Sequence, residues 1–149
     1  VEELKKQAEK IGLKVREISV TNVSEVNQNL TAALNDIDAL YAPTDNTVAS
    51  ADDLVGNLCV SKDVPMLCAE EAGVSKGGLC SIGIDYKKLG KEAGYKAADI
   101  LNGKDPKDIE ITTLSDMSIV INEDVVKKLN LTVPSDIDAK ATKVTGGVN

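Results

Sequence analysis

The chain has 149 residues, enough for one domain with a sizeable core, and 42% of them are hydrophobic. Its formal net charge of −7 and its lack of a Lys/Arg-rich stretch argue against a nucleic-acid partner. It contains 0 histidines, so the commonest general base and the commonest metal ligand are both missing. No apolar run approaches the roughly 18 residues of a membrane-spanning helix.

The first half of the chain reads as alternating helices and strands. Apolar residues at helical spacing predict a helix over 1–11. Residues 14–20 are predicted to be a half-buried strand, followed by a second helix that Asn22 or Ser24 caps. A strand over 38–42, a helix over about 48–60 and a buried strand over 64–69 complete this half.

The second half opens with a polar loop over 70–78 and a strand over 79–84. An amphipathic helix is predicted from about 86 to 101, where Gly90 and Gly94 thin one side so that another backbone can approach. Three further elements follow: an extended segment over 109–122, a short helix over 123–129 and a polar tail that begins at Pro134.

This alternation predicts an α/β fold with parallel strands joined by right-handed crossovers. A helix at the very start normally follows a strand in the centre of such a sheet. We therefore expect the first strand of the sheet to lie upstream of Val1.

The three cysteines are expected to be packing residues. Cys59, Cys68 and Cys80 are nine and twelve residues apart and form no C-x-x-C pair, which argues against zinc. Free cysteine commonly behaves as a small buried hydrophobe. We expect no metal site and no cofactor.

A polar cluster directly follows the predicted strand 38–42 and consists of Thr44, Asp45, Asn46 and Thr47. Open α/β sheets bind ligands at the carboxyl ends of their strands. Hydroxyls, a carboxylate and an amide within four residues suit recognition of a small polar molecule. The cluster has no nucleophile–base pair of its own, and we do not expect an enzyme.

Three stretches in this order resemble one known family: YAPTDNTVASA, VPMLCAEEAGVSKGGLCSIGIDYKKLGKEAGYKAADILNGK and SIVINEDVVKKLNLTVP. They look like the substrate-binding proteins of ABC importers, most of all the tryptophan/aromatic amino acid type called TrpX-like. The resemblance implies a type I periplasmic binding protein with two lobes, each a three-layer parallel sheet in flavodoxin-like order. This chain would be its C-terminal half.

The same resemblance divides the chain into three parts. Residues 1–84 would form most of lobe two, 85–108 the hinge and a helix that packs on lobe one, and 109–149 the return to lobe two and a tail. Without lobe one that helix exposes an apolar face, so the chain alone is expected to self-associate or to be locally disordered.

The implied function is that of the solute-binding component of an ABC importer. An aromatic amino acid such as tryptophan would be held between the lobes and delivered to the transmembrane permease subunits. The protein would be extracytoplasmic, either periplasmic or lipid-anchored to the outer face of the cell membrane. The effector-binding domain of a LacI-like transcriptional regulator, which has the same architecture, stays open as the alternative.

For an amino acid ligand, the candidate partners of the α-ammonium are Asp45, Glu70 and Asp85. The further candidate ligand contacts are Thr44, Asn46, Thr47 and Tyr86. Asp85 is equally a candidate to cap the helix that begins at Tyr86. Thr47 is likewise a candidate to cap the helix that follows it, over about 48–60. The pair Asp52-Asp53 is interpreted as first-turn helix charge.

Overall fold

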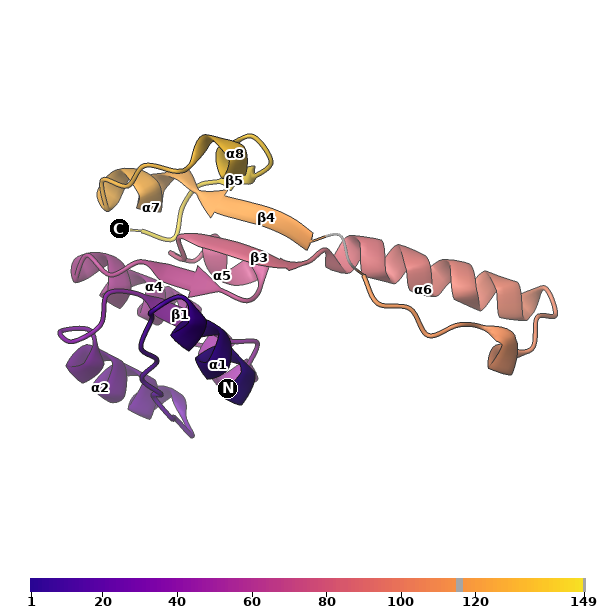
Figure 1. Ribbon diagram of the computed structural model, residues 1–149, viewed down its shortest axis with the longest axis horizontal. Helices are drawn as coiled ribbons and strands as arrows, with labels where there is room; N and C mark the ends of the chain where they lie inside the picture. Colours follow the sequence, from indigo (N-terminus) through magenta and orange to yellow (C-terminus); the bar gives the residue numbers. More distant parts are fainter. Residues whose placement is uncertain (115–116, 149) are drawn as a thin grey trace.

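The computed structural model describes residues 1–114 and 117–148, whose five strands form one sheet flanked by helices (Figure 1). The strands, in their order across the sheet, are β1 (Leu40–Ala42), β2 (Met66–Cys68), β3 (Cys80–Ile84), β4 (Met117–Asn122) and β5 (Thr142–Val144). The first three strands are parallel, β4 is antiparallel to β3, and β5 is parallel to β4. This mostly parallel sheet with helices confirms the predicted α/β fold class.

The helices include those predicted over 1–11 and 86–101 and the one predicted after Asn22. They are α1 (Glu2–Lys10), α2 (Val23–Ala33), α3 (Asn46–Ala49), α4 (Asp52–Ser61), α5 (Glu71–Val74), α6 (Tyr86–Leu101), α7 (Glu123–Lys128) and α8 (Ser135–Asp138), with a 3₁₀ turn η1 at Pro106–Asp108. Asn22, not Ser24, caps α2, and its side chain accepts a hydrogen bond from the Glu25 backbone N–H at 3.0 Å. Within the described chain, no helix combines the length and apolar character needed to cross a bilayer.

Several predicted boundaries are wrong. Residues 14–20 form no strand and take no part in the sheet. The predicted helix over 48–60 is two helices, α3 and α4, and the predicted loop 70–78 contains α5. The predicted polar tail contains α8 and β5, and β5 forms by pairing with β4 rather than from a local apolar pattern.

The antiparallel pairing of β3 and β4 follows from the path of α6. This helix and the segment that returns along it form an arm that extends from the sheet (Figure 1). Lys96 ties the two together: its Nζ donates to the Glu110 carbonyl at 2.6 Å and to Thr112 Oγ1 at 2.8 Å. Since the chain leaves and re-enters the sheet at the same edge, β4 runs opposite to β3 and no right-handed crossover joins them.

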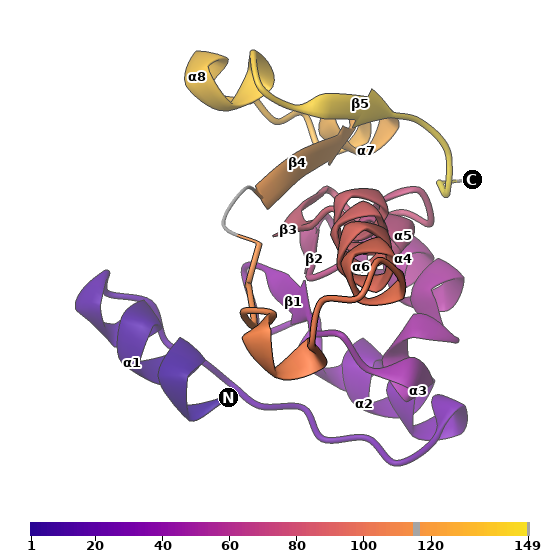
Figure 2. The ribbon, with the colours of Figure 1, turned by 90° about the vertical axis from the view of Figure 1, so that its right-hand side faces the viewer.

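The core lies on one face of the sheet. Side chains from α2, α4 and α5 pack there against alternate residues of the strands, and the buried apolar set includes Leu30, Val55, Met66, Val74 and Val120. On the opposite face Tyr41, Leu67 and Ile82 are exposed. Helix α1 lies on that side (Figure 2) but contributes only Ala8 to the buried residues of the described chain. Parallel sheets are usually covered on both faces. The face that carries Tyr41, Leu67 and Ile82 is therefore an open apolar surface, and apolar side chains are exposed on the arm as well.

The cysteines are free thiols, and two of them are core residues. Cys59 and Cys68 are buried, and burial raises the pKa of each thiol to about 12. Cys80 is half-buried in β3. The interpretation of the cysteines as packing residues is confirmed for Cys59 and Cys68.

Candidate functional site

The three loops that carry the candidate binding residues Asp45, Glu70 and Asp85 lie at one edge of the sheet. Because β1, β2 and β3 are parallel, the loops that follow Ala42, Cys68 and Ile84 leave the sheet on the same side. Ala42 is in register with Cys68, and Cys68 with Ser81. β3 continues three residues past that row, so Asp85 lies farther out than the ends of β1 and β2.

Asp45 begins helix α3. Its Oδ1 accepts hydrogen bonds from the backbone N–H groups of Thr47, at 2.8 Å, and Val48, at 3.0 Å. The cap of this helix is therefore Asp45 and not Thr47, which lies in its first turn. Thr44 and Asn46 are exposed beside Asp45, and Thr47 is half-buried.

Glu70 stands at the start of α5 but does not cap it with its side chain. Its loop is joined to the first loop by the Ala69 backbone N–H, which donates to the Ala42 carbonyl at 2.9 Å. Strand β3 also approaches this loop closely: a Cβ on Gly83 would lie 2.6 Å from the Ala69 carbonyl oxygen. Backbone contacts thus hold these three strand ends together.

Asp85 is the N-cap of α6, one of the two roles that the sequence allowed for it. Its Oδ1 accepts hydrogen bonds from the backbone N–H groups of Lys87, at 2.9 Å, and Lys88, at 3.0 Å. Tyr86, the first residue of the helix, is exposed. Capping uses one carboxylate oxygen of Asp85, and the other accepts no hydrogen bond from the residues that the structure describes.

Asp52 and Lys76 form a contact behind these loops that the sequence analysis missed. Asp52 is only 7% exposed, and its Oδ2 lies 3.8 Å from Lys76 Nζ. Burial raises the pKa of the Asp52 carboxyl, an effect that the Lys76 charge opposes and that Asp53 and Glu70 reinforce. The first-turn interpretation holds for both acidic residues by position, but only Asp52 is buried. The sequence carries no local signal for this pair, because 24 residues separate its members.

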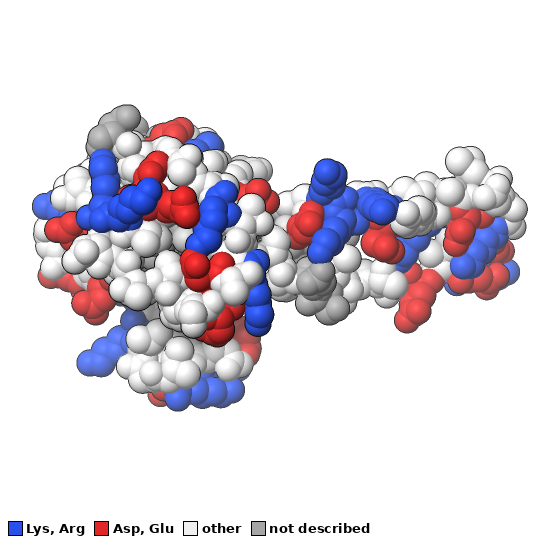
Figure 3. Space-filling view, turned by 90° about the horizontal axis from the view of Figure 1, so that it is seen from above, with Lys and Arg blue, Asp and Glu red and all other residues white. Residues whose placement is uncertain are grey.

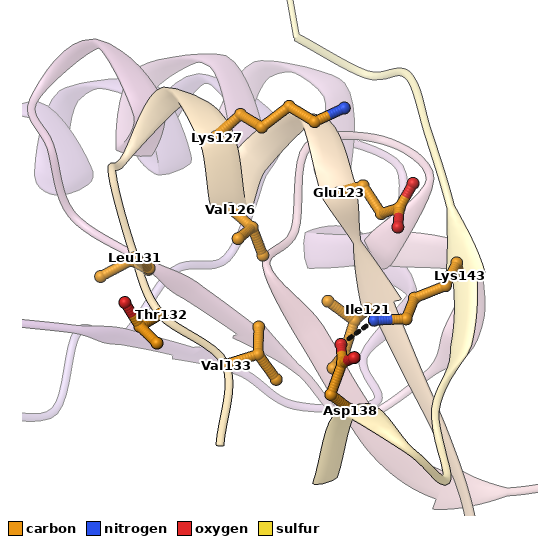
Figure 4. A pocket seen from close by; sticks show the side chains of 9 residues that line it. All are labelled: Ile121, Glu123, Val126, Lys127, Leu131, Thr132, Val133, Asp138 and Lys143. Atoms are coloured by element: carbon orange, nitrogen blue, oxygen red, sulfur yellow. Dashed lines mark hydrogen bonds and ion pairs between the residues drawn. The ribbon is translucent and has the colours of Figure 1, made fainter. Parts of the chain in front are cut away.

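A hollow of about 350 Å³ lies elsewhere, between β4, α7 and α8 (Figure 4). It is lined by Ile121, Glu123, Val126, Lys127, Leu131, Thr132, Val133, Asp138 and Lys143. The Asp138–Lys143 ion pair crosses it. Because β4 is antiparallel to β3, the carboxyl end of β4 points to the opposite edge of the sheet. This hollow is therefore separate from the three predicted loops.

The surface charge is mixed. On the face shown in Figure 3, Lys and Arg side chains alternate with Asp and Glu over both the body and the arm. Among the described residues, no group of three or more Cys, Asp or Glu side chains is placed to hold a metal ion. The candidate residues themselves carry carboxylates and hydrogen-bonding side chains, the groups that bind a cationic ligand most strongly.

Open α/β sheets bind ligands at the loops that follow the carboxyl ends of their strands. The chain belongs to the ABC transporter substrate-binding protein family, whose model matches residues 1–145. A protein from Clostridioides difficile (strain R20291) described as tyrosine-binding is 38% identical over 152 residues, which cover 96% of this chain and 44% of that relative.

Two solved structures have the same fold. The ABC domain from Streptococcus pneumonia in complex with L-Trp gives a TM-score of 0.83 at 32% identity, over 99% of this chain and 49% of that one. The ligand-free, open form of a substrate-binding protein with adhesive properties from Clostridium difficile gives a TM-score of 0.79 at 39% identity, over 97% of this chain and 48% of that one. The chain therefore spans about half the length of the proteins it matches.

Proposed function

We propose that this chain is the carboxyl-terminal part of the solute-binding component of an ABC importer. The whole protein would hold an aromatic amino acid, tryptophan or tyrosine, between two lobes and deliver it to the transmembrane permease subunits. The observation that carries the proposal is family membership over residues 1–145, together with relatives described as binding tyrosine and L-Trp. The protein would act outside the cytoplasm, in the periplasm or anchored by lipid to the outer face of the membrane.

The binding residues proposed for the ligand ammonium are Asp45, Glu70 and Asp85. Their support is the common sheet edge and, for the two aspartates, a carboxylate oxygen that takes no part in capping within the described residues. Thr44, Asn46, Thr47 and Tyr86 would add polar contacts and a wall for the side chain. The ligand carboxylate would be met by the other lobe.

The proposed division of the chain keeps its sequence-based boundaries: lobe two over 1–84, the hinge and a helix on lobe one over 85–108, and the return over 109–149. Apolar exposure on the arm supports it. Leu101 is 87% exposed at the end of α6, and Ile111 on the returning segment is 95% exposed. Lobe one would cover this apolar surface in the whole protein.

Thermal melting of the complete two-lobed protein tests the function. A ligand at a hundredfold its Kd stabilises the folded state by about 2.7 kcal/mol, enough for a clear rise in Tm. We expect a selective rise with L-tryptophan or L-tyrosine and none with a panel of sugars. A rise in Tm with sugars alone, or the absence of a rise with every amino acid tested, would contradict the aromatic assignment.

A further inference from the structure

Lys76 connects the helix that begins after Asp45 to the helix that begins after Glu70. It follows α5, and its own backbone N–H donates to the Gly73 carbonyl at 3.2 Å. Its Nζ donates to the carbonyl of Ala49, the last residue of α3, at 3.4 Å. The same Nζ lies 3.8 Å from Oδ2 of Asp52, the first residue of α4. One side chain therefore spans α5, α3 and α4.

The carboxylate of Asp52 fixes the other end of this connection. A Cβ on Gly73 would lie 3.5 Å from Asp52 Oδ2, so the carboxylate is packed against α5. Asp52 is only 7% exposed, so removal of Lys76, whose side chain is 39% exposed, would leave a largely buried carboxylate without its neighbouring cation. The pair therefore favours the arrangement in which α5 and the α3–α4 junction stay together.

The base from which Lys76 extends is held rigidly. Asn122 Nδ2 donates to the Val74 carbonyl, the last of α5, at 2.8 Å, and to the Gly146 carbonyl at 2.9 Å. Next to Lys76, a Cβ on Gly77 would lie 3.0 Å from Gly56 Cα in α4. Because α5 is anchored at this end, Lys76 extends from a fixed base to the end of α3 and the start of α4.

We propose that Lys76 and Asp52 are positioning residues that set the spacing between the Asp45 and Glu70 carboxylates. The proposal rests on the proposed function for the ligand that these carboxylates bind. A purely electrostatic role predicts the opposite effect, since removing a cation near an ammonium site strengthens attraction for the ammonium. The sign of the change in affinity therefore separates the two roles.

The first test is calorimetric titration of the complete protein with L-tryptophan and L-tyrosine. Lys76→Met is expected to raise the Kd about tenfold, the effect of weakening one charged ligand contact. Lys76→Arg should restore it, because the guanidinium can serve both acceptors. The matched control is Lys62→Met at the other end of α4, where Lys62 Nζ donates to Asn35 Oδ1 at the same 3.4 Å. An unchanged or lower Kd for Lys76→Met would overturn the proposal, whereas a wild type that binds neither amino acid would overturn the proposed function.

The second test needs no ligand and uses amide hydrogen exchange. The N–H groups of Thr47 and Val48 bond to Asp45, and those of Lys87 and Lys88 make the matching bonds to Asp85. Lys76→Met should speed exchange severalfold at the first pair and leave the second pair unchanged. Equal acceleration at both caps would indicate a general loss of stability, and no acceleration would show that Lys76 does not hold α3; either outcome overturns the proposal.

Discussion

Asp45 and Asp85 make the same pair of hydrogen bonds at the ends of β1 and β3. Each uses Oδ1 to accept from the backbone N–H groups two and three residues later, at 2.8 and 3.0 Å for Asp45 and at 2.9 and 3.0 Å for Asp85. Each cap fixes the orientation of a carboxylate at the edge where we propose that ligand binds. The capping role and the proposed binding role are therefore compatible in both residues.

Asparagine substitutions separate these two roles. Asp45→Asn and Asp85→Asn retain a cap of equal quality but lose the charge, so stability should change little while affinity for the amino acid falls by about 1.5–3 kcal/mol. Asp45→Ala should weaken binding by the same amount. Because alanine also removes the cap of α3, this variant should in addition lose about 0.5–2 kcal/mol of stability. Titration calorimetry and urea denaturation of the complete protein measure the two effects. Unchanged titration curves for both asparagine variants would remove these residues from the site.

Gly83→Ala should be destabilising because of the close approach between β3 and the loop after β2. The added Cβ would lie 2.6 Å from the Ala69 carbonyl oxygen, and relieving that overlap costs about 1–3 kcal/mol. Gly90→Ala is the control, since nothing lies within 4 Å of its Cβ and it should stabilise the α6 helix by about 0.5–1 kcal/mol. Urea unfolding of this chain compares them. Similar free energies for the two variants would argue against the close approach.

Asn122→Ala should lower the free energy of unfolding by about 2–4 kcal/mol, because its side chain is fully buried and fully hydrogen-bonded. Its Nδ2 serves Val74 and Gly146, and its Oδ1 accepts from the backbone N–H groups of Asp124 and Val125. For comparison, Asn57 makes one side-chain bond, at 2.8 Å, to the Asp53 carbonyl within its own helix. Asn57→Ala should cost less than about 1 kcal/mol, and a cost as large as that of Asn122→Ala would show that the buried network adds little.

The Asp52 carboxyl should make stability depend on pH in a direction opposite to ordinary acid denaturation. Burial raises the pKa of Asp52 in the folded state above 3.8, its ordinary value, which applies in the unfolded state. At pH values between the unfolded-state pKa and the folded-state pKa, the folded state therefore binds more protons than the unfolded state. Its contribution to stability is complete below 3.8 and is lost as pH rises through the raised value. As the pH falls through this window, the free energy of unfolding of the wild type should therefore rise relative to that of Asp52→Asn. Urea denaturation of both proteins at several pH values measures this difference. The charged groups that act on Asp52 are Lys76, Asp53 and Glu70. A difference in unfolding free energy that stays constant with pH would contradict the raised pKa of Asp52.

The exposed arm predicts that this chain associates when it is produced alone. Leu101 and Ile111 are 87% and 95% exposed, and burial of such side chains is worth about 1.5–3 kcal/mol each. Light scattering should show a mass that rises with concentration, and the double variant Leu101→Ser/Ile111→Ser should reduce that rise. A mass that stays monomeric over the whole concentration range would contradict this expectation.

Local signals in the sequence determined α6 and its cap. The apolar spacing over 86–101 predicted the observed bounds Tyr86–Leu101, and an aspartate before a helix is a recognisable N-cap. The three loops at one sheet edge also followed from the sequence, because parallel strands end on the same side. The helix and its cap depend on residues within a few positions of one another, whereas the common edge depends on the parallel pairing of strands that are distant in the sequence.

Only the tertiary structure decided the direction of β4, the presence of β5 and the pairing of Asp52 with Lys76. β5 has 3 residues and becomes a strand because β4 pairs with it, and β4 runs backward because the arm returns the chain to the edge it left. Asp52 became a buried ion because α5 packs over the start of α4. Contacts between distant segments make these features, and propensity and spacing along the chain carry no record of them.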